Sequence, residues 1–361
     1  MKLFKRFAAA ALAAVMAASF AACSGKDTSW AAKNGETVVP VGAYIADMMQ
    51  KYSYQAALFG SEDVLKETMG EGEEKTTVAQ SIQNESKENT ARALAILAKA
   101  EELGLSLTEE EEASIKAGVD HTWDTNGELY EKNGVADTSI EFLTRVSMLS
   151  EKIFAATYGK GGSEEVPEQE LKDLMDEKYM LAGMMVFQKP AKTPVKEDAT
   201  EEEKAMAEET YNTSMQTLRF EAQDWLTRAT SMKGQGKEFN EVMAEYEKEH
   251  AEDPSKVDMT ANRYVLVAKD ASDAPQEVVD AMEKATIGEP QMVESEQYLV
   301  VFAKQDMHKD PMYFEQERNA LLGELKSEDY EAMIKAYAES LTIEYNDAAL
   351  SKYVPKKIKL K

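Results

Sequence analysis

A glycine-rich break at residues 159–162 divides the chain into segments with different hydrophobic periodicity. Before the break, apolar residues recur at three- and four-residue steps, a spacing that predicts amphipathic helices. After it, residues 179–187 form an apolar run without a helical period, which predicts a buried strand. Helical periodicity returns after Pro311. The sequence therefore predicts an α+β protein whose segments follow the order α, α+β, α.

Residues with special backbone roles mark the ends of these helices. Pro40 suits a helix start, Gly60 and Gly104 suit helix ends, and Thr108 with Glu111 has the spacing of a capping box. Helices are expected over residues 40–59, 77–103, from 108 onward, 139–158, 167–178, 201–232, 239–250, 276–284 and 314–341. Strands are expected over residues 179–187, 263–268 and 297–304, so the middle segment should carry a small sheet.

The strongly negative charge of the chain excludes several classes of partner. Lys and Arg number 41 against 67 Asp and Glu, which gives a formal net charge of −26. Nucleic acids are bound mainly through Lys and Arg contacts to phosphate, so no nucleic-acid partner is expected. Electrostatic docking on anionic lipid is disfavoured for the same reason. Hydrophobic residues make up 43% of the chain, which is enough to build packed cores.

The supply of catalytic and metal-binding side chains is also small. One Cys and three His exclude an intrachain disulfide and a Cys/His zinc site. We expect His121, His250 and His308 to be surface residues. The acidic runs 108–112 and 201–203 lack the spacing of a Ca²⁺-binding loop and are expected to be solvated helix starts. Without a G-x-S-x-G motif, no nucleophile triad is expected, and we expect no cofactor and no metal.

The N-terminus has the layout of a bacterial lipoprotein signal. A basic start is followed by an apolar run over residues 7–18, which is too short to span a bilayer. The only cysteine, Cys23, follows Phe20 and two alanines, a pattern that resembles the lipobox. We therefore expect a signal peptide over residues 1–22, lipidation of Cys23 and a flexible tether over residues 23–39. The alternative is a non-lipidated signal in which Cys23 is incidental.

Several short motifs follow one another in a set order along the rest of the chain. They are Trp30-Ala31 through Gly35, the runs 40–44 and 100–108, residues 166–178, 236–244 and 281–289, and the closing segments 341–346 and 353–357. Their order and spacing resemble those of PrsA/SurA-type extracytoplasmic foldases. The resemblance implies one helical chaperone domain formed by residues 40–165 and 309–361. It also implies that residues 166–308 form an inserted α+β domain of the parvulin peptidyl-prolyl isomerase type.

The catalytic positions depart from the pattern of this family. Parvulins carry one histidine in the first strand and a second in the last strand, and the matching positions here are Met184 and Leu299. Neither side chain can replace the hydrogen bonds of an imidazole. The Gly-rich segment is missing, and Asp253 is only a loose match to the acidic position. The proline pocket maps at best to Val278 or Val279 and to Met282. The resemblance therefore implies a parvulin-like domain with no recognisable catalytic residues.

Client binding is the activity that the resemblance leaves for this chain. The partners would be unfolded secreted polypeptides, and the location would be the outer face of a bacterial membrane. Candidate contact residues are Tyr44, Met48, Met49, Tyr52 and Tyr54, because Met and Tyr offer adaptable apolar contacts. The alternative is that these residues are ordinary core. Two other functions remain open: an active isomerase with an unconventional site, and a non-catalytic surface scaffold.

Overall fold

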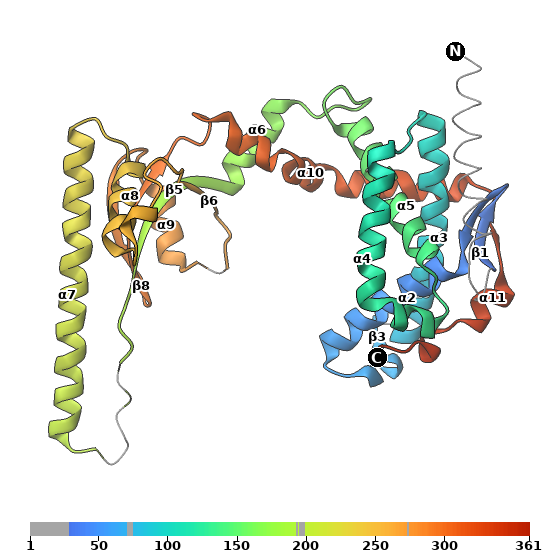
Figure 1. Ribbon diagram of the computed structural model, residues 1–361, viewed down its shortest axis with the longest axis horizontal. Helices are drawn as coiled ribbons and strands as arrows, with labels where there is room; N and C mark the ends of the chain where they lie inside the picture. The colour runs from blue at the N-terminus through green and yellow to red at the C-terminus, as the bar shows by residue number, and fades with distance from the viewer. Residues whose placement is uncertain (1–28, 71–74, 193, 195–198, 273) are drawn as a thin grey trace. The chain divides into compact units, whose positions relative to one another are not determined.

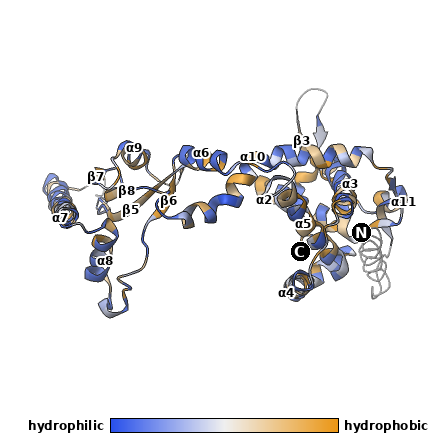
Figure 2. Ribbon diagram, turned by 90° about the horizontal axis from the view of Figure 1, so that it is seen from above, coloured by the Kyte–Doolittle hydropathy of each residue, from blue (hydrophilic) through white to orange (hydrophobic). Residues whose placement is uncertain are grey.

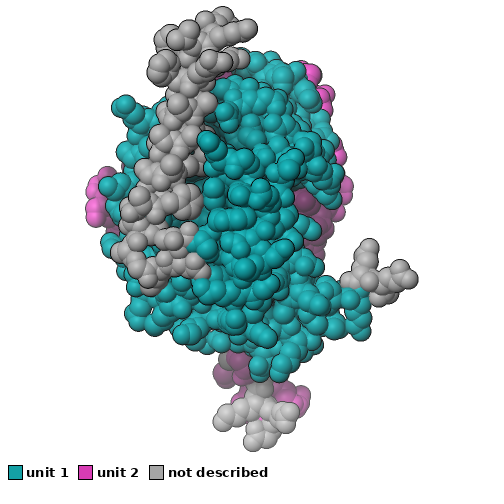
Figure 3. Space-filling model, turned by 90° about the vertical axis from the view of Figure 1, so that its right-hand side faces the viewer, with its two compact units in different colours: residues 1–166, 324–361 teal, residues 167–323 magenta. Residues whose placement is uncertain are grey.

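The computed structural model describes residues 29–70, 75–192, 194, 199–272 and 274–361. The predicted signal peptide over residues 1–22 and Cys23, the expected lipidation site, lie outside the described residues. The chain forms two compact units. Unit 1 comprises Met1–Val166 with Glu324–Lys361, and unit 2 comprises Pro167–Gly323, as the colours of Figure 3 show.

Unit 1 is mainly helical. Its elements are β1 (Trp30–Asn34), β2 (Thr37–Pro40), α2 (Val41–Phe59), the short 3-10 helix η1 (Glu62–Lys66), β3 (Thr68–Met69), β4 (Thr76–Thr77), α3 (Val78–Leu103), α4 (Glu109–Asn133), α5 (Asp137–Tyr158), β9 (Glu344–Tyr345), α11 (Asp347–Lys352) and the 3-10 helix η4 (Pro355–Lys357). The long helix α10 (Pro311–Ser340) carries residues of both units.

The ends of the unit 1 helices lie where the capping residues predict them. Gly60 and Gly104 follow α2 and α3 in the left-handed conformation, with φ of 65° and 68°, which suits glycine because it has no Cβ. Thr108 caps α4 in a capping box: its side chain accepts from the Glu111 N–H, and the Glu111 carboxylate accepts from the Thr108 N–H. Local sequence signals therefore determine these boundaries.

The expected tether over residues 23–39 is wrong from residue 30 onward. β1 and β2 form an antiparallel hairpin, and β1 also pairs with β9 from the other end of the chain. Ala31 and Ala32 are completely buried, because the hairpin packs against α2 and α3. A polar stretch with small apolar residues resembles a linker in sequence, but here each small side chain fills a core position.

Unit 2 is built on a four-stranded antiparallel sheet of order β6-β5-β8-β7. Its elements are α6 (Glu168–Lys178), β5 (Tyr179–Gln188), α7 (Glu201–Gly234), α8 (Phe239–His250), the 3-10 helix η3 (Pro254–Lys256), β6 (Val265–Ala268), α9 (Gln276–Lys284), β7 (Pro290–Glu294) and β8 (Tyr298–Gln305). β7 is a strand that the periodicity of the sequence did not predict.

Helices cover both faces of this sheet, with α7 and α8 on one face and α9 on the other (Figure 1). Residues of β5 alternate between the two cores, as the period of a strand requires. Met185 and Phe187 join the α7/α8 core, and Met180 and Ala182 join the α9 core. Gly183 allows the close approach of α8, because a Cβ there would lie 2.5 Å from the Met243 Cε atom.

Hydropathy along the ribbon agrees with this packing. In Figure 2, β5 is coloured hydrophobic and α7 mostly hydrophilic. Across the part of the chain that the structure describes, no helix is both long enough and apolar enough to span a bilayer.

Candidate functional site

Four of the five predicted client-contact residues belong to the core of unit 1. Tyr44, Met48, Met49 and Tyr52 are all buried in the cluster that α2 forms with β1, α3 and α11. The Tyr52 hydroxyl donates to the Glu62 carbonyl oxygen at 2.7 Å. In this structure the four side chains therefore cannot contact a polypeptide from solution. Their helical spacing is that of a core-facing stripe, which is the alternative that the sequence left open.

The fifth residue, Tyr54, is part of an exposed apolar surface at the C-terminal end of α2. Tyr54 and Leu58 lie one helical turn apart, and each is 66% exposed. Phe59, the last residue of α2, is 49% exposed. We call these three residues the α2 patch. Large apolar side chains that gather in solvent are candidates for binding other polypeptides.

The structure does not bring the two positions matched to the parvulin histidines together. Met184 lies opposite Phe302 across the β5–β8 ladder, whereas Leu299 lies opposite Phe187. Residues directly opposite each other share a face of the sheet, and successive residues alternate between faces. Met184 therefore lies on the α9 face, and Leu299 lies on the α7/α8 face, where it is fully buried.

The α9 face is the part of unit 2 where the positions matched to the proline pocket meet Met184. Val278, Val279 and Met282 of α9 pack there with Phe302, and Met184 lies partly buried beside them. The cross-strand partner of Met184 is thus Phe302, which lies three residues after Leu299 in β8. Only the pairing register identifies it, because a shift of one residue moves a side chain to the other face. The fully buried side chains that fill this face are apolar.

Asp253, the loose match to the acidic position, has a local role. Its carboxylate accepts hydrogen bonds from the Ser255 N–H at 3.1 Å and the Ser255 hydroxyl at 2.6 Å, where η3 begins. These bonds, with Lys256, lower the pKa of Asp253 below its usual value. Asp253 therefore acts as the cap of a short 3-10 helix.

His250 connects α8 to α7 on the face opposite α9. Its Nδ1 atom is 2.7 Å from the Tyr246 carbonyl oxygen, and its Nε2 atom is 3.0 Å from Glu221 Oε1. Both partners are acceptors when Glu221 is ionised, so both contacts are hydrogen bonds only if the ring carries two protons. Desolvation opposes this protonation, but the Tyr246 carbonyl and the Glu221 carboxylate outweigh it and raise the pKa of His250.

The other two histidines do not form a catalytic group either. His308 Nε2 is 2.8 Å from Asp176 Oδ1 at the surface of unit 2, and His121 is an exposed residue of α4. Within the described ranges, no group of three or more His, Cys, Asp and Glu side chains could hold a metal ion.

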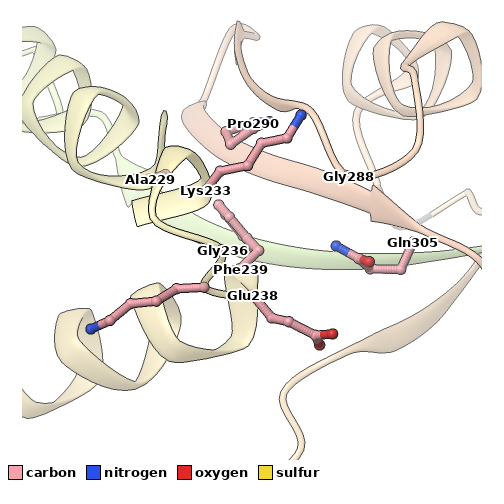
Figure 4. Close-up of a pocket in the computed structure, with 9 residues that line it drawn as sticks. Ala229, Lys233, Gly236, Glu238, Phe239, Gly288, Pro290 and Gln305 are labelled. Atoms are coloured by element: carbon pink, nitrogen blue, oxygen red, sulfur yellow. The ribbon is translucent and has the colours of Figure 1, made fainter. Parts of the chain in front are cut away.

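A cavity of about 250 Å³ lies where α7 ends and α8 begins (Figure 4). Its lining includes Phe239 of the motif over residues 236–244, together with Gly288, Pro290 and Gln305. The charges at its rim already have partners. Lys233 pairs with Glu289, and Glu238 accepts from Lys309 Nζ at 2.6 Å. The cavity therefore offers limited polar recognition and no catalytic group.

The solved structures that are similar to this chain include foldase proteins and a SurA-like chaperone. No family model matches the sequence, and the search of curated proteins found no match. Among solved structures, the foldase protein PrsA from Streptococcus pneumoniae has 12% identity and a TM-score of 0.35, and the match covers 79% of this chain and 97% of that chain. PrsA from Lactococcus lactis has 13% identity and a TM-score of 0.36, with 92% and 100% covered. A SurA-like chaperone structure from Campylobacter jejuni has 12% identity and a TM-score of 0.24, with 88% and 98% covered. These are proteins of the family that the sequence motifs resemble.

Proposed function

We propose that this chain is a lipid-anchored extracytoplasmic chaperone that binds unfolded polypeptides and does not isomerise prolyl bonds. The observation that carries the proposal is the α2 patch, where Tyr54, Leu58 and Phe59 stand in solvent at the end of one helix. The order of the sequence motifs supports the same function. The net charge of −26 would keep a protein with such a surface soluble while it holds an apolar client.

The absence of isomerase activity is proposed from the α9 face. Rotation about an Xaa-Pro bond has a barrier of about 20 kcal/mol, and an enzyme lowers it by positioned polar groups in a desolvated pocket. Met184, Phe302 and Met282 supply apolar bulk on that face and no hydrogen-bond donor. The fold of the sheet does not depend on such donors, so the domain can persist without the chemistry.

Chaperone activity is tested by suppression of aggregation of a chemically unfolded test protein. We expect the chain to suppress aggregation, and we expect Leu58→Ser to weaken the suppression several-fold, since burial of one leucine side chain contributes about 1.5–3 kcal/mol. Leu103→Ser is the matched control, because Leu103 is a 43% exposed leucine at the end of α3, also in unit 1. Equal loss in both variants, or no suppression by the unmodified chain, would contradict the proposal.

Catalysis is tested with an Xaa-Pro peptide in a coupled isomerisation assay. We expect the unmodified chain to leave the rate at its uncatalysed value. The variant with Met184→His and Leu299→His is expected to do the same, because those two positions lie on opposite faces of the sheet. Saturable catalysis by the unmodified chain would favour the alternative of an isomerase with an unconventional site.

A further inference from the structure

One edge of β5 is paired along only part of its length. β6 pairs with β5 from Tyr179 to Ala182, whereas β8 pairs with β5 from Leu181 to Gln188. Within the described ranges, residues 183–188 therefore have a neighbouring strand on one side only. An unpaired edge within a sheet is a template for another extended chain.

Hydrogen bonds at the strand ends show which backbone groups face this open edge. The Lys269 N–H donates to the Lys178 carbonyl oxygen at 2.8 Å. The backbone N–H and C=O groups of even-numbered residues in β5 therefore point toward β6. The Lys189 N–H donates to the Gln297 carbonyl oxygen at 2.9 Å, so the backbone N–H and C=O groups of odd-numbered residues point toward β8. The N–H and C=O groups of Met184, Val186 and Gln188 thus point to the side that β6 leaves open. No described residue hydrogen-bonds to them.

The edge is open because Asn240 draws the segment before β6 away from the sheet. Asn240 Nδ2 donates to the Ala261 carbonyl oxygen at 2.9 Å, and Asn240 Oδ1 accepts from the Arg263 N–H at 2.9 Å. The Asn240 N–H itself donates to the Tyr264 hydroxyl at 3.0 Å. Residues 261–264 are therefore held at the start of α8. A straight continuation of β6 would have placed them beside Met184 and Val186.

The side chains that flank the edge are apolar and accessible. Val186 is 48% exposed and Val265 is 45% exposed, and both lie on the α9 face. Lys189, which directly follows β5, is already paired, because its Nζ atom is 2.7 Å from Glu294 Oε1. Hydrogen bonds from Arg219 and Lys189 lower the pKa of Glu294 to about 2 and keep it ionised. The described side chains beside this edge thus match an extended, apolar polypeptide.

We propose that residues 184–188 bind a segment of an unfolded client as an added antiparallel strand, in line with β6. Backbone hydrogen bonds to Met184, Val186 and Gln188 would supply affinity without sequence specificity. Val186 and Val265 would favour apolar residues at alternate positions of the client. This inference rests on the proposed chaperone function and assigns it a second binding site, which is separate from the α2 patch.

The direct test is residue-resolved amide hydrogen exchange by NMR on the full chain. The probe is the acetylated and amidated peptide Lys-Val-Thr-Val-Thr-Val-Lys. At saturating peptide we expect exchange at Met184, Val186 and Gln188 to slow at least about tenfold, because each N–H gains a hydrogen bond. Exchange at Gly183, Met185 and Phe187 should not change, since their amides already bond to β8. The same peptide with N-methyl groups on alternate residues should not bind.

A substitution separates backbone pairing from side-chain contact. Val186→Pro removes the N–H that faces the open edge, at a position where a strand tolerates proline, and it also changes the side chain. Val186→Ala keeps this N–H and shortens the side chain. We expect the proline variant to lower peptide affinity about tenfold and the alanine variant to lower it less. If the proline variant does not fold, amide exchange in the unmodified chain decides alone.

The outcomes distinguish this inference from the proposed function. Suppression of aggregation together with bound peptide and unprotected amides at 184, 186 and 188 would overturn the edge site and leave the chaperone function standing. Protection of the three amides without suppression of aggregation would support the edge site and contradict the function. Protection that appears without peptide and grows with protein concentration would assign the edge to a second copy of the chain, and would also overturn the proposal.

Discussion

Replacing Met48 with alanine is expected to lower the free energy of unfolding of unit 1 by about 3 kcal/mol. Met48 is fully buried between α2 and its neighbours, so truncation leaves a cavity that the surrounding Ile45, Ile82 and Val78 side chains can fill only partly. Amide exchange of α2 in increasing denaturant measures the change within unit 1 alone. A loss below about 1 kcal/mol would show that Met48 is not a core residue.

Tyr54→Ala in the same helix is the control for Met48→Ala. Tyr54 is largely exposed, and substitutions at such positions usually change stability by less than about 0.5 kcal/mol. We therefore expect Met48→Ala to lower mainly the stability and Tyr54→Ala to weaken mainly the suppression of aggregation. This pair separates the core stripe of α2 from its exposed patch.

Replacing Cys23 with serine is expected to move the protein from the membrane fraction to the soluble fraction of cells. A diacylglyceryl thioether supplies the two acyl chains that stable anchoring requires, and serine has no thiol to accept it. Cys23 is the only cysteine of the sequence, so no other residue can carry the thioether. The loss of protein from the membrane fraction should therefore be nearly complete. Fractionation followed by detection of the protein in each fraction measures it.

Ser24→Ala is the matched control for Cys23→Ser, because it changes the neighbouring residue and keeps the thiol. We expect Ser24→Ala to remain with the membrane. If the membrane-bound share is the same in Cys23→Ser as in the unmodified protein, the anchor lies elsewhere, and the alternative of a signal with an incidental cysteine gains support.

The helices could be predicted closely because their signals are local. Pro40, Gly60, Gly104 and Thr108 act within one turn of the chain, and each is found where its backbone preference places it. The apolar run 179–187 was long enough to identify β5. Such elements need no knowledge of distant residues.

The short strands and the pairing register of β5 with β8 could not be predicted, because they depend on pairing between distant residues. β1, β2 and β7 have five residues or fewer, and their stability comes from neighbours in the sheet. The same reason applies to the residue that lies opposite Met184. Leu299 and Phe302 both lie in one apolar strand, and only the β5–β8 register places Phe302 opposite Met184. The candidate contact residues of α2 are a different case, since a helical stripe of Met and Tyr has the same sequence pattern in a core and on a binding surface.

The pairing of β1 with β9 has a consequence for the order in which a growing chain can fold. Chains emerge with the N-terminus first, and most domains begin to fold in that order. Here β1 can complete its pairing only after β9 has been synthesised. Asn133 likewise exchanges hydrogen bonds with the backbone of Lys359, 226 residues further along. All of unit 2 emerges before these partners do. The inserted unit can therefore be complete while the unit that begins first is still unfinished, and unit 1 closes only when the last residues of the chain arrive.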